Sequence, residues 1–345
     1  MVILLVSMCL PRLALAAFEG TATTKIQVED FRGRRLNFEA PVKRIVCLLD
    51  SALTGLYMLE AEQNVVGVSM TAYTGSSAPY YTAMDSRIRE KSLPVVSNAA
   101  AVSLERILAL KPELVITFSL NKEIIAALEE RGVAVFGVFI EKVEDIYKEV
   151  LALGEMTGNA PRARELVAFS RRQVALIREK TGAVSIDRWP DTYFMWAKGE
   201  MDSGGRKSIV QELLNISGAV NICGHINQEH VVISMEQLLV ANPSIIIMWF
   251  NELMDPVDIS TKPAWKILTA SRNHRIYEIP DLFCCDLWTL NFQYTVMLMA
   301  TWCHPELFNE LDLEREAQTI FQRLYGVKLP DNLIAPGWHR TGSGL

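Results

Sequence analysis

Several segments that follow predicted strands carry large aromatic or positively charged side chains. Tryptophan and tyrosine offer a broad, rigid contact surface with one polar tip. Lysine and arginine neutralise anions, and arginine does so with a planar fork. These residue types are suited to holding an extended ligand and to balancing negative charge on it. The candidate ligand-binding residues are Tyr73, Tyr80, Trp196, Lys198, Arg206, Trp249, Phe283 and Trp288.

Four further residues of the same segments have polar or aromatic side chains. Asp50, Ser51 and Tyr81 belong to the first half of the chain, and Asn251 belongs to the second. In open α/β sheets, ligands bind beyond the carboxyl ends of the parallel strands. We therefore expect these side chains to meet where the predicted strands end.

Each candidate also has an ordinary structural explanation. Trp196 and Trp249 are equally suited to a buried core at the end of a strand. Lys198 and Arg206 are equally suited to solvated loops, where most lysines and arginines are found. Trp288 lies in a predicted loop with exposed neighbours, which favours a binding role.

Metal-binding residues are few. A bare metal site is not predicted, because histidine is the usual ligand for zinc-like ions and the spacing of His225 and His230 fits no helical pair. For iron or nickel that arrives as a chelate, His225, His230 and Cys285 are the candidate direct ligands. The histidines of the chain are His225, His230, His274, His304 and His339.

Motifs for nucleotide or hydrolase chemistry are absent from the sequence. We find no G-x-G-x-x-G after a predicted strand, no G-x-x-x-x-G-K-[ST] and no G-x-S-x-G. No catalytic residue and no intrinsic cofactor are therefore predicted. The net charge of −6, without any block of like charge, argues against a nucleic-acid partner.

The elements that must position the candidates occur in a repeated pattern. Residues 102–118 and 233–249 share a Ser-x-Glu start, a proline and a final apolar run. The serines Ser103 and Ser234 suit helix N-caps, the proline ends the helix, and the apolar run suits a strand buried on both faces. Each copy predicts a helix that leads into a central strand. The alternative is a chance similarity between two ordinary helix–strand units.

Two such copies in 345 residues predict two α/β lobes. We place the first lobe at residues 24–142, two connecting helices at 143–182 and the second lobe at 183–345. The second connecting helix has roughly 20 residues and a length of about 30 Å. A single helix of that length acts as a stiff strut, unlike a flexible Gly/Ser linker.

The amino-terminal segment has the features of an export signal. An apolar run is followed by Ala14-Leu15-Ala16, an A-x-A cleavage motif. We predict a signal peptide at residues 1–16 and a periplasmic or extracytoplasmic location. The alternatives are a buried first strand or helix, and a lipid anchor at Cys9.

Five cysteines follow the predicted signal peptide. Cys47 and Cys303 lie in apolar segments and suit packed thiols. The pairing of Cys223, Cys284 and Cys285 stays open, and no C-x-x-C spacing is present.

Motifs along nearly the whole mature chain resemble a known family. They are Asp30-Phe31-Arg32-Gly33-Arg34, Lys43-Arg44-Ile45-Val46, both Ser-x-Glu repeats, Gly205-Arg206-Lys207-Ser208, Gly218-Ala219-Val220-Asn221, the stretch 265–277 and His304-Pro305-Glu306-Leu307-Phe308. In order and spacing they resemble the extracytoplasmic substrate-binding proteins of ABC importers for ferric siderophores, haem and cobalamin.

The resemblance implies a class III periplasmic-binding-protein fold. Two Rossmann-like three-layer lobes would be joined by one long interlobe helix, with a large, flat or aromatic ligand in the cleft and little hinge closure. It also implies a monomer that docks onto an ABC permease, with its ATPase, through one acidic side chain on each lobe. Glu212 stands at the expected place in the second lobe. In the first lobe Gly55 occupies that place, so Glu60 is the nearest candidate.

The leading hypothesis is a binding protein that delivers an iron–siderophore or similar metal chelate to an importer. A cobalamin or haem carrier of the same fold is the first alternative. An enzyme of the metallocluster or chelatase type on a two-lobed scaffold is an alternative of another class. An extracytoplasmic sensor or adhesion module is a third.

Overall fold

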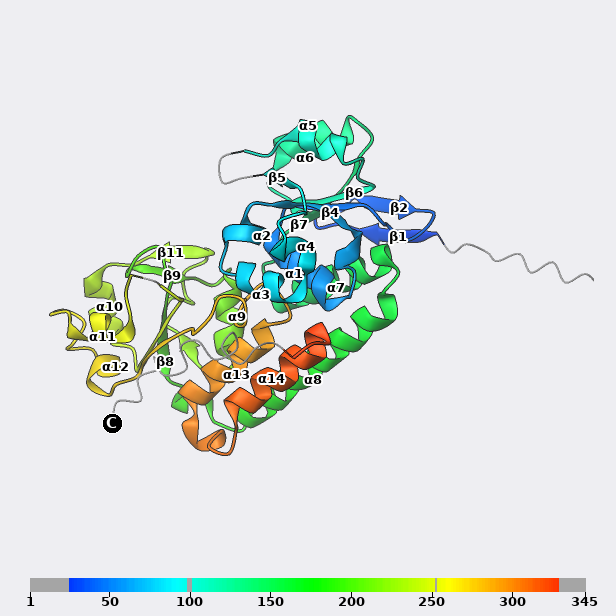
Figure 1. Cartoon of the computed structure of the whole chain (residues 1–345). Coiled ribbons are helices and arrows are strands. Elements are labelled where there is room, and N and C mark those ends of the chain that lie inside the picture. The colour runs from blue at the N-terminus through cyan, green and yellow to red at the C-terminus, as the bar shows by residue number, and fades with distance from the viewer. Residues whose placement is uncertain (1–24, 98–100, 252, 329–345) are drawn as a thin grey trace, which may run out of the picture.

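The computed structural model describes residues 25–97, 101–251 and 253–328. The signal peptide predicted for residues 1–16 lies outside these residues and stays a prediction. Within the described ranges, no helix is both long enough and apolar enough to cross a bilayer. The chain forms two α/β lobes, each with its own parallel sheet (Figure 1).

The first lobe is built around a five-stranded parallel sheet. In the order in which they pair, its strands are β5 (Val95–Ser97), β4 (Val65–Ser69), β3 (Ile45–Cys47), β6 (Leu114–Phe118) and β7 (Ala134–Val138). Ile45 and Cys47 belong to one buried cluster, whereas Val46 between them belongs to another. Both faces of the sheet are therefore covered, which is why its strands are continuous apolar runs.

Helices cover the two faces of this sheet (Figure 1). On one face lie α5 (Leu104–Ala109) and α6 (Lys122–Glu129), and on the other lie α1 (Asp50–Met58) and α7 (Val143–Thr157). The structure thus confirms a three-layer first lobe.

The second lobe has a smaller parallel sheet of four strands. In pairing order they are β10 (Val220–Asn221), β8 (Asp191–Met195), β12 (Ile245–Met248) and β13 (Ile276–Glu278). Here too neighbouring residues face opposite sides, since Phe194 and Tyr193 belong to different buried clusters. Its helices include α9 (Ile209–Ile216), α10 (Met235–Ala241), α11 (Pro256–Thr261) and α12 (Thr269–Arg272).

Both copies of the repeated segment fold as predicted. The hydroxyl of Ser103 accepts a hydrogen bond from the backbone of Arg106 at the start of α5, and Ser234 accepts one from Gln237 at the start of α10. Each helix leads into an inner strand of its sheet, β6 in the first lobe and β12 in the second. The sequence repeat therefore marks equivalent places in two similar lobes.

One long helix joins the lobes. This is α8 (Ala160–Gly182), whose 23 residues span about 34 Å. Alongside it lie α13 (Phe292–Cys303) and α14 (Leu313–Tyr325), as Figure 1 shows. Arg162 of α8 ties them together, because its guanidinium donates to the carbonyls of Arg323 and Leu324 in α14.

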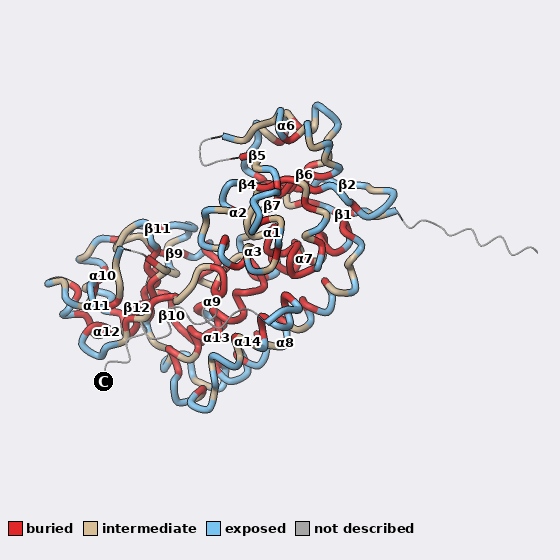
Figure 2. The backbone as a smooth tube through the Cα atoms, viewed as in Figure 1, coloured by how far each residue is buried: buried red, intermediate tan, exposed pale blue. Residues whose placement is uncertain are grey.

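Buried apolar side chains run without interruption from one lobe to the other. A single cluster includes Leu53 of α1 and Leu153 of α7 together with Leu213 of α9 and Leu298 of α13. In Figure 2 the buried segments continue from the first sheet through α7 and α13 to the second sheet. Lobes that share a large apolar interface move little relative to each other, which agrees with the little hinge closure implied by the family.

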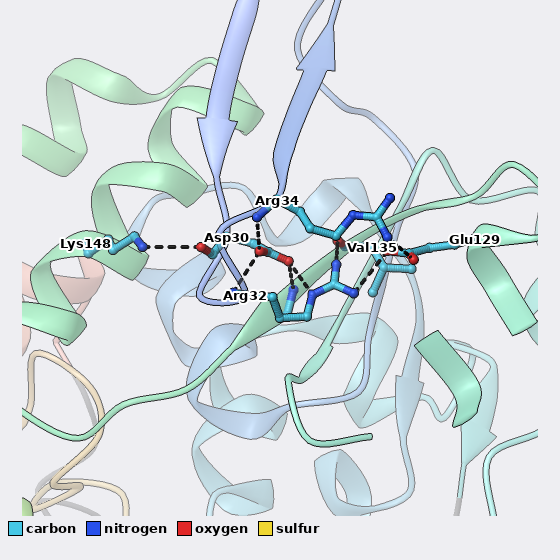
Figure 3. Close-up of polar contacts among 7 residues, drawn as sticks. Asp30, Arg32, Arg34, Glu129, Val135 and Lys148 are labelled. Atoms are coloured by element: carbon cyan, nitrogen blue, oxygen red, sulfur yellow. Dashed lines mark hydrogen bonds and ion pairs between the residues drawn. The ribbon is translucent and has the colours of Figure 1, made fainter. Parts of the chain in front are cut away.

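A hairpin at the amino-terminal end of the described chain is anchored by a buried carboxylate. Between β1 (Ile26–Glu29) and β2 (Arg35–Phe38), the fully buried Asp30 accepts hydrogen bonds from the backbones of Arg32, Arg34 and Gly137 and from the Arg32 side chain. Arg32 also donates to Glu129 of α6 and to a carbonyl of β7 (Figure 3). Gly33 lies in the turn with a φ of 77°, a conformation that glycine adopts without strain.

Three local features have no clear signal in the sequence. The N-cap of α1 is Leu49, which makes no side-chain cap although the polar Asp50 and Ser51 follow it. The segment after β4 is mostly helical, and it forms α2 (Thr71–Thr74), α3 (Ala78–Met84) and α4 (Ser86–Arg89). The glycine-rich segment 197–206 contains β9 (Asp202–Gly204), which pairs with β11 (His230–Val232). These last strands are only three residues long, too short for a periodicity to be visible.

Candidate ligand-binding site

A cavity of about 470 Å³ lies between the lobes, where the carboxyl ends of strands from both sheets meet. This is the place at which ligands bind in open α/β folds. From the first lobe it is lined by Leu49, Asp50, Ser51, Ser76, Ser77, Phe118, Val138, Phe139 and Ile140. From the second lobe it is lined by Glu229, Trp249, Leu282, Asp286 and Trp288.

Tryptophans form the wall on the side of the second lobe. Trp249 follows β12 directly and lines the cavity with Trp288, the two rings standing edge to face with centroids 5.9 Å apart. Trp196, buried behind them, stacks on Trp288 at 6.0 Å and meets Trp249 at 5.5 Å. The structure therefore brings the three predicted tryptophans together. Trp249 and Trp288 are placed to touch a ligand, and Trp196 is placed to support them.

The facing wall carries two phenylalanines that the sequence analysis did not propose. Phe118 is the last residue of β6, and Phe139 directly follows β7, with ring centroids 5.5 Å apart. Phe118 is 36% exposed although it ends a buried strand. The signal was available, because Phe118 occupies the position in the first repeat that Trp249 occupies in the second.

Tyr80 and Phe283 do not line the cavity. Both are buried, and their rings stack at 4.2 Å between the first lobe and the second. The Tyr80 hydroxyl also lies 3.3 Å from the sulfur of Cys284. The prediction that they contact a ligand is contradicted by this burial, since each ring is covered by the other lobe.

The remaining predicted contacts lie away from the cavity. The Tyr73 hydroxyl donates to the carbonyl of Leu93 within the first lobe. Arg206 donates to the carbonyl of Gly224, and Lys198 is exposed in a turn after β8. None of these three residues lines the cavity. Lys198 and Arg206 are therefore not placed to neutralise an anion bound there, contrary to the expectation from the sequence.

Carboxylates, by contrast, do line the cavity. Asp50, in the first turn of α1, accepts a hydrogen bond from Thr71 at 2.7 Å. Asp286 accepts one from the backbone of Trp288 at 2.9 Å, and the exposed Glu229 stands at the rim. Burial, together with the negative charge of Asp50, raises the pKa of Asp286 to about 7. Burial likewise raises the pKa of Asp50.

A third buried carboxyl group lies close to Asp286 without reaching the cavity. Glu149 of α7 is only 2% exposed, and within the described residues its Oε1 has no hydrogen-bond partner. Burial and the nearby charge of Asp286 raise the pKa of Glu149 to about 8. Side chains with a strongly shifted pKa are more frequent at functional sites than elsewhere in a protein.

Metal-ligating side chains are not gathered here. No group of three histidine, cysteine or acidic side chains suited to a metal ion occurs in the described ranges. His225 bonds the carbonyl of Ile222, and His230 lies against Trp196. Cys285 is fully buried, so it cannot ligate a chelate in the cavity. The five cysteines of the described chain are buried and form no disulfide, as expected for the packed thiols Cys47 and Cys303.

The two acidic residues proposed for permease docking differ in their surroundings. Both carboxylate oxygens of Glu212 are engaged, one by the backbone of Val143 at 2.8 Å and one by Arg178 at 3.6 Å. Glu60 is exposed and pairs with Arg162, at the end of α1 opposite the cavity. A permease contact for either residue stays a prediction.

Known proteins resemble the chain over most of its length. The periplasmic binding protein family matches residues 45–282. An uncharacterised ABC transporter substrate-binding lipoprotein of Bacillus subtilis, YvrC, is 23% identical over 274 residues, which cover 77% of this chain and 82% of the relative. The molybdate-binding protein MolA of Haemophilus influenzae is 22% identical over 347 residues, which cover 92% and 96%.

Solved structures share the two-lobed fold. The crystal structure of Helicobacter pylori CeuE with Ni(II) bound has a TM-score of 0.74 to this chain, and the match covers 91% of this chain and all of that one. The sequence identity is 20%, so this likeness establishes the fold and leaves the ligand open.

Proposed function

Because the chain belongs to the periplasmic binding protein family, we propose that it is the substrate-binding component of an ABC importer. It captures a metal chelate, such as an iron–siderophore complex, in the cavity between the lobes and delivers it to the permease and its ATPase. The observation that carries this proposal is the cavity itself, which lies at the strand ends of both sheets and has Trp249 and Trp288 as one wall.

The mechanism is equilibrium capture without covalent chemistry. Flat indole and phenyl faces remove apolar ligand surface from water, and hydroxyl groups of Ser51, Ser76 and Ser77 offer hydrogen bonds to its polar edge. Since the lobes share one apolar core, the cavity is largely formed before the ligand arrives. Preformed sites lose less free energy to ordering on binding.

The cavity volume suits a compact ligand. Sites for small molecules typically measure about 300–1,000 Å³, and about 470 Å³ lies in the lower half of that range. A chelate of one metal ion fits this size, and cobalamin and haem remain the alternatives carried by the same fold. Export to the periplasm and action as a monomer belong to the same proposal.

A ligand screen tests the proposal directly. Tryptophan fluorescence of the full chain is titrated with ferric siderophores, haem, cobalamin and nickel chelates. One of them is expected to give a saturable change, because indole rings line the cavity and stack behind it. Chemical turnover of any of these compounds without a stable complex would instead support the chelatase or metallocluster alternative. The absence of a fluorescence change with every one of these compounds would refute the binding function.

A further inference from the structure

The charges that line the cavity all have one sign. Asp50, Glu229 and Asp286 are the ionisable residues among its described lining, and no lysine, arginine or histidine is among them. Across the described residues, none of the three forms an ion pair with a basic side chain; Asp50 bonds a threonine hydroxyl and Asp286 a backbone amide. A ligand would therefore meet carboxyl groups that no basic side chain of the described residues offsets.

Aromatic rings form two facing walls of the cavity. Trp249 and Trp288 form one wall, and Phe118 and Phe139 form the facing one. The face of an aromatic ring carries negative potential and attracts cations, and tryptophan does so best. Aromatic walls with unpaired carboxylates between them are the combination that binds a positive charge with an apolar periphery.

The buried Glu149 lies behind this lining and does not add to its charge at neutral pH, because burial and the charge of Asp286 raise its pKa to about 8. An anionic ligand would meet the carboxyl groups of Asp50, Glu229 and Asp286 and no positive side chain of the described lining. Lys198 and Arg206, the basic residues proposed from the sequence, lie outside the lining.

A bare metal ion does not fit this arrangement. In the part of the chain that the structure describes, no group of three metal-ligating side chains is close enough to hold one. The positive charge must then be carried by a larger species, in which organic groups surround or bear the charge.

We infer that the cavity selects a compact cation with an apolar or aromatic periphery, either a positively charged metal chelate or an organic cation. This inference rests on the binding function proposed above and names the chemical class of its ligand. It disfavours haem, which carries two propionate carboxylates, and oxyanions such as molybdate.

Pairs of probes with matched shape and opposite charge test the inference. Tris(ethylenediamine)cobalt(III) and tris(oxalato)cobaltate(III) are octahedral chelates of one metal, the first cationic and the second anionic. Tetraphenylphosphonium and tetraphenylborate form the organic pair. In calorimetric titrations of the full chain, we expect the cation of at least one pair to bind tenfold or more tightly than its anion. The pair that binds identifies the source of the charge.

Variants locate the preference. Asp50→Asn and Asp286→Asn together should reduce affinity for the bound cation at least tenfold, whereas Glu310→Gln, an exposed acid outside the lining, should leave it unchanged. Should the double variant misfold, Glu229→Gln at the rim gives a weaker effect of the same sign.

The outcomes separate the two proposals. An anion that binds as tightly as its matched cation, or more tightly, overturns the charge inference and leaves the binding function standing. If the four probes and every compound of the fluorescence screen fail to bind, both proposals fall.

Discussion

At the scale of single residues, substitution of Trp288 gives the most direct test of the site. It lines the cavity and contacts both of the other tryptophans. Trp288→Ala is expected to weaken binding of the ligand found by screening by about 1–3 kcal/mol, as for a buried aromatic anchor. Trp302→Phe is the control, since Trp302 stacks on Tyr277 away from the cavity. Equal affinity in the two variants would remove Trp288 from the site.

The raised pKa of Glu149 predicts how the stability of the folded chain depends on pH. Its folded-state pKa is about 8, against an ordinary value of 4.5, so between these values the folded chain holds a proton that the unfolded chain has released. Stability must then fall as pH rises through this window. Glu149→Gln should remove the loss and raise the free energy of unfolding above pH 8 by more than about 1.4 kcal/mol, the equivalent of one pKa unit.

Thermal denaturation between pH 4.5 and pH 8 measures this effect. The melting temperatures of the variant and the unaltered chain should converge towards the acid end and separate towards the alkaline end. Glu155→Gln on the same helix, where the carboxylate is half-exposed and paired with Arg164, should give parallel curves. A constant difference between Glu149→Gln and the unaltered chain would show that the Glu149 carboxyl is not held neutral.

At the scale of elements, the hairpin β1–β2 depends on one side chain. Asp30 gathers three backbone amides and the Arg32 guanidinium in a fully buried site (Figure 3). Asp30→Ala leaves the Arg32 charge without its buried partner, which costs about 3–5 kcal/mol of stability. Urea denaturation checks this value. Lys25→Ala breaks an exposed ion pair of the same hairpin and should cost less than about 1 kcal/mol.

Elements with strong local determinants were predictable from sequence. The capping serines Ser103 and Ser234 and the prolines after their helices mark α5 and α10, and the strands that follow are unbroken apolar runs. The bounds of α14 are also marked locally, since Asp312 caps its start and Gly326 follows its end. Short strands such as β9 and β11 were missed, because three residues pair only through tertiary contacts that local sequence does not encode.

The same limit explains the errors at the site. Loops were predicted correctly as the origin of Trp249 and Trp288, since both follow strands. Tyr80 and Phe283 also follow strands, but they face each other across the lobe junction and are buried there. The two residues are 203 positions apart in the sequence, so local sequence patterns cannot reveal their contact. Which aromatic rings remain accessible to a ligand is determined by the packing of the two lobes.

At the scale of the whole molecule, the lobes behave as one cooperative unit. The Tyr80–Phe283 stack, the Tyr147–Phe292 contact and the shared apolar cluster join them across the junction. We expect a single calorimetric unfolding transition, with equal calorimetric and van't Hoff enthalpies, because neither lobe can unfold without exposing the other's core. The Tyr80→Ala substitution should lower the midpoint of this transition and begin to separate it into two transitions, one for each lobe. Two transitions in the unaltered chain would mean that the lobes are independent, and a rigid, preformed cavity between them would then lose its physical basis.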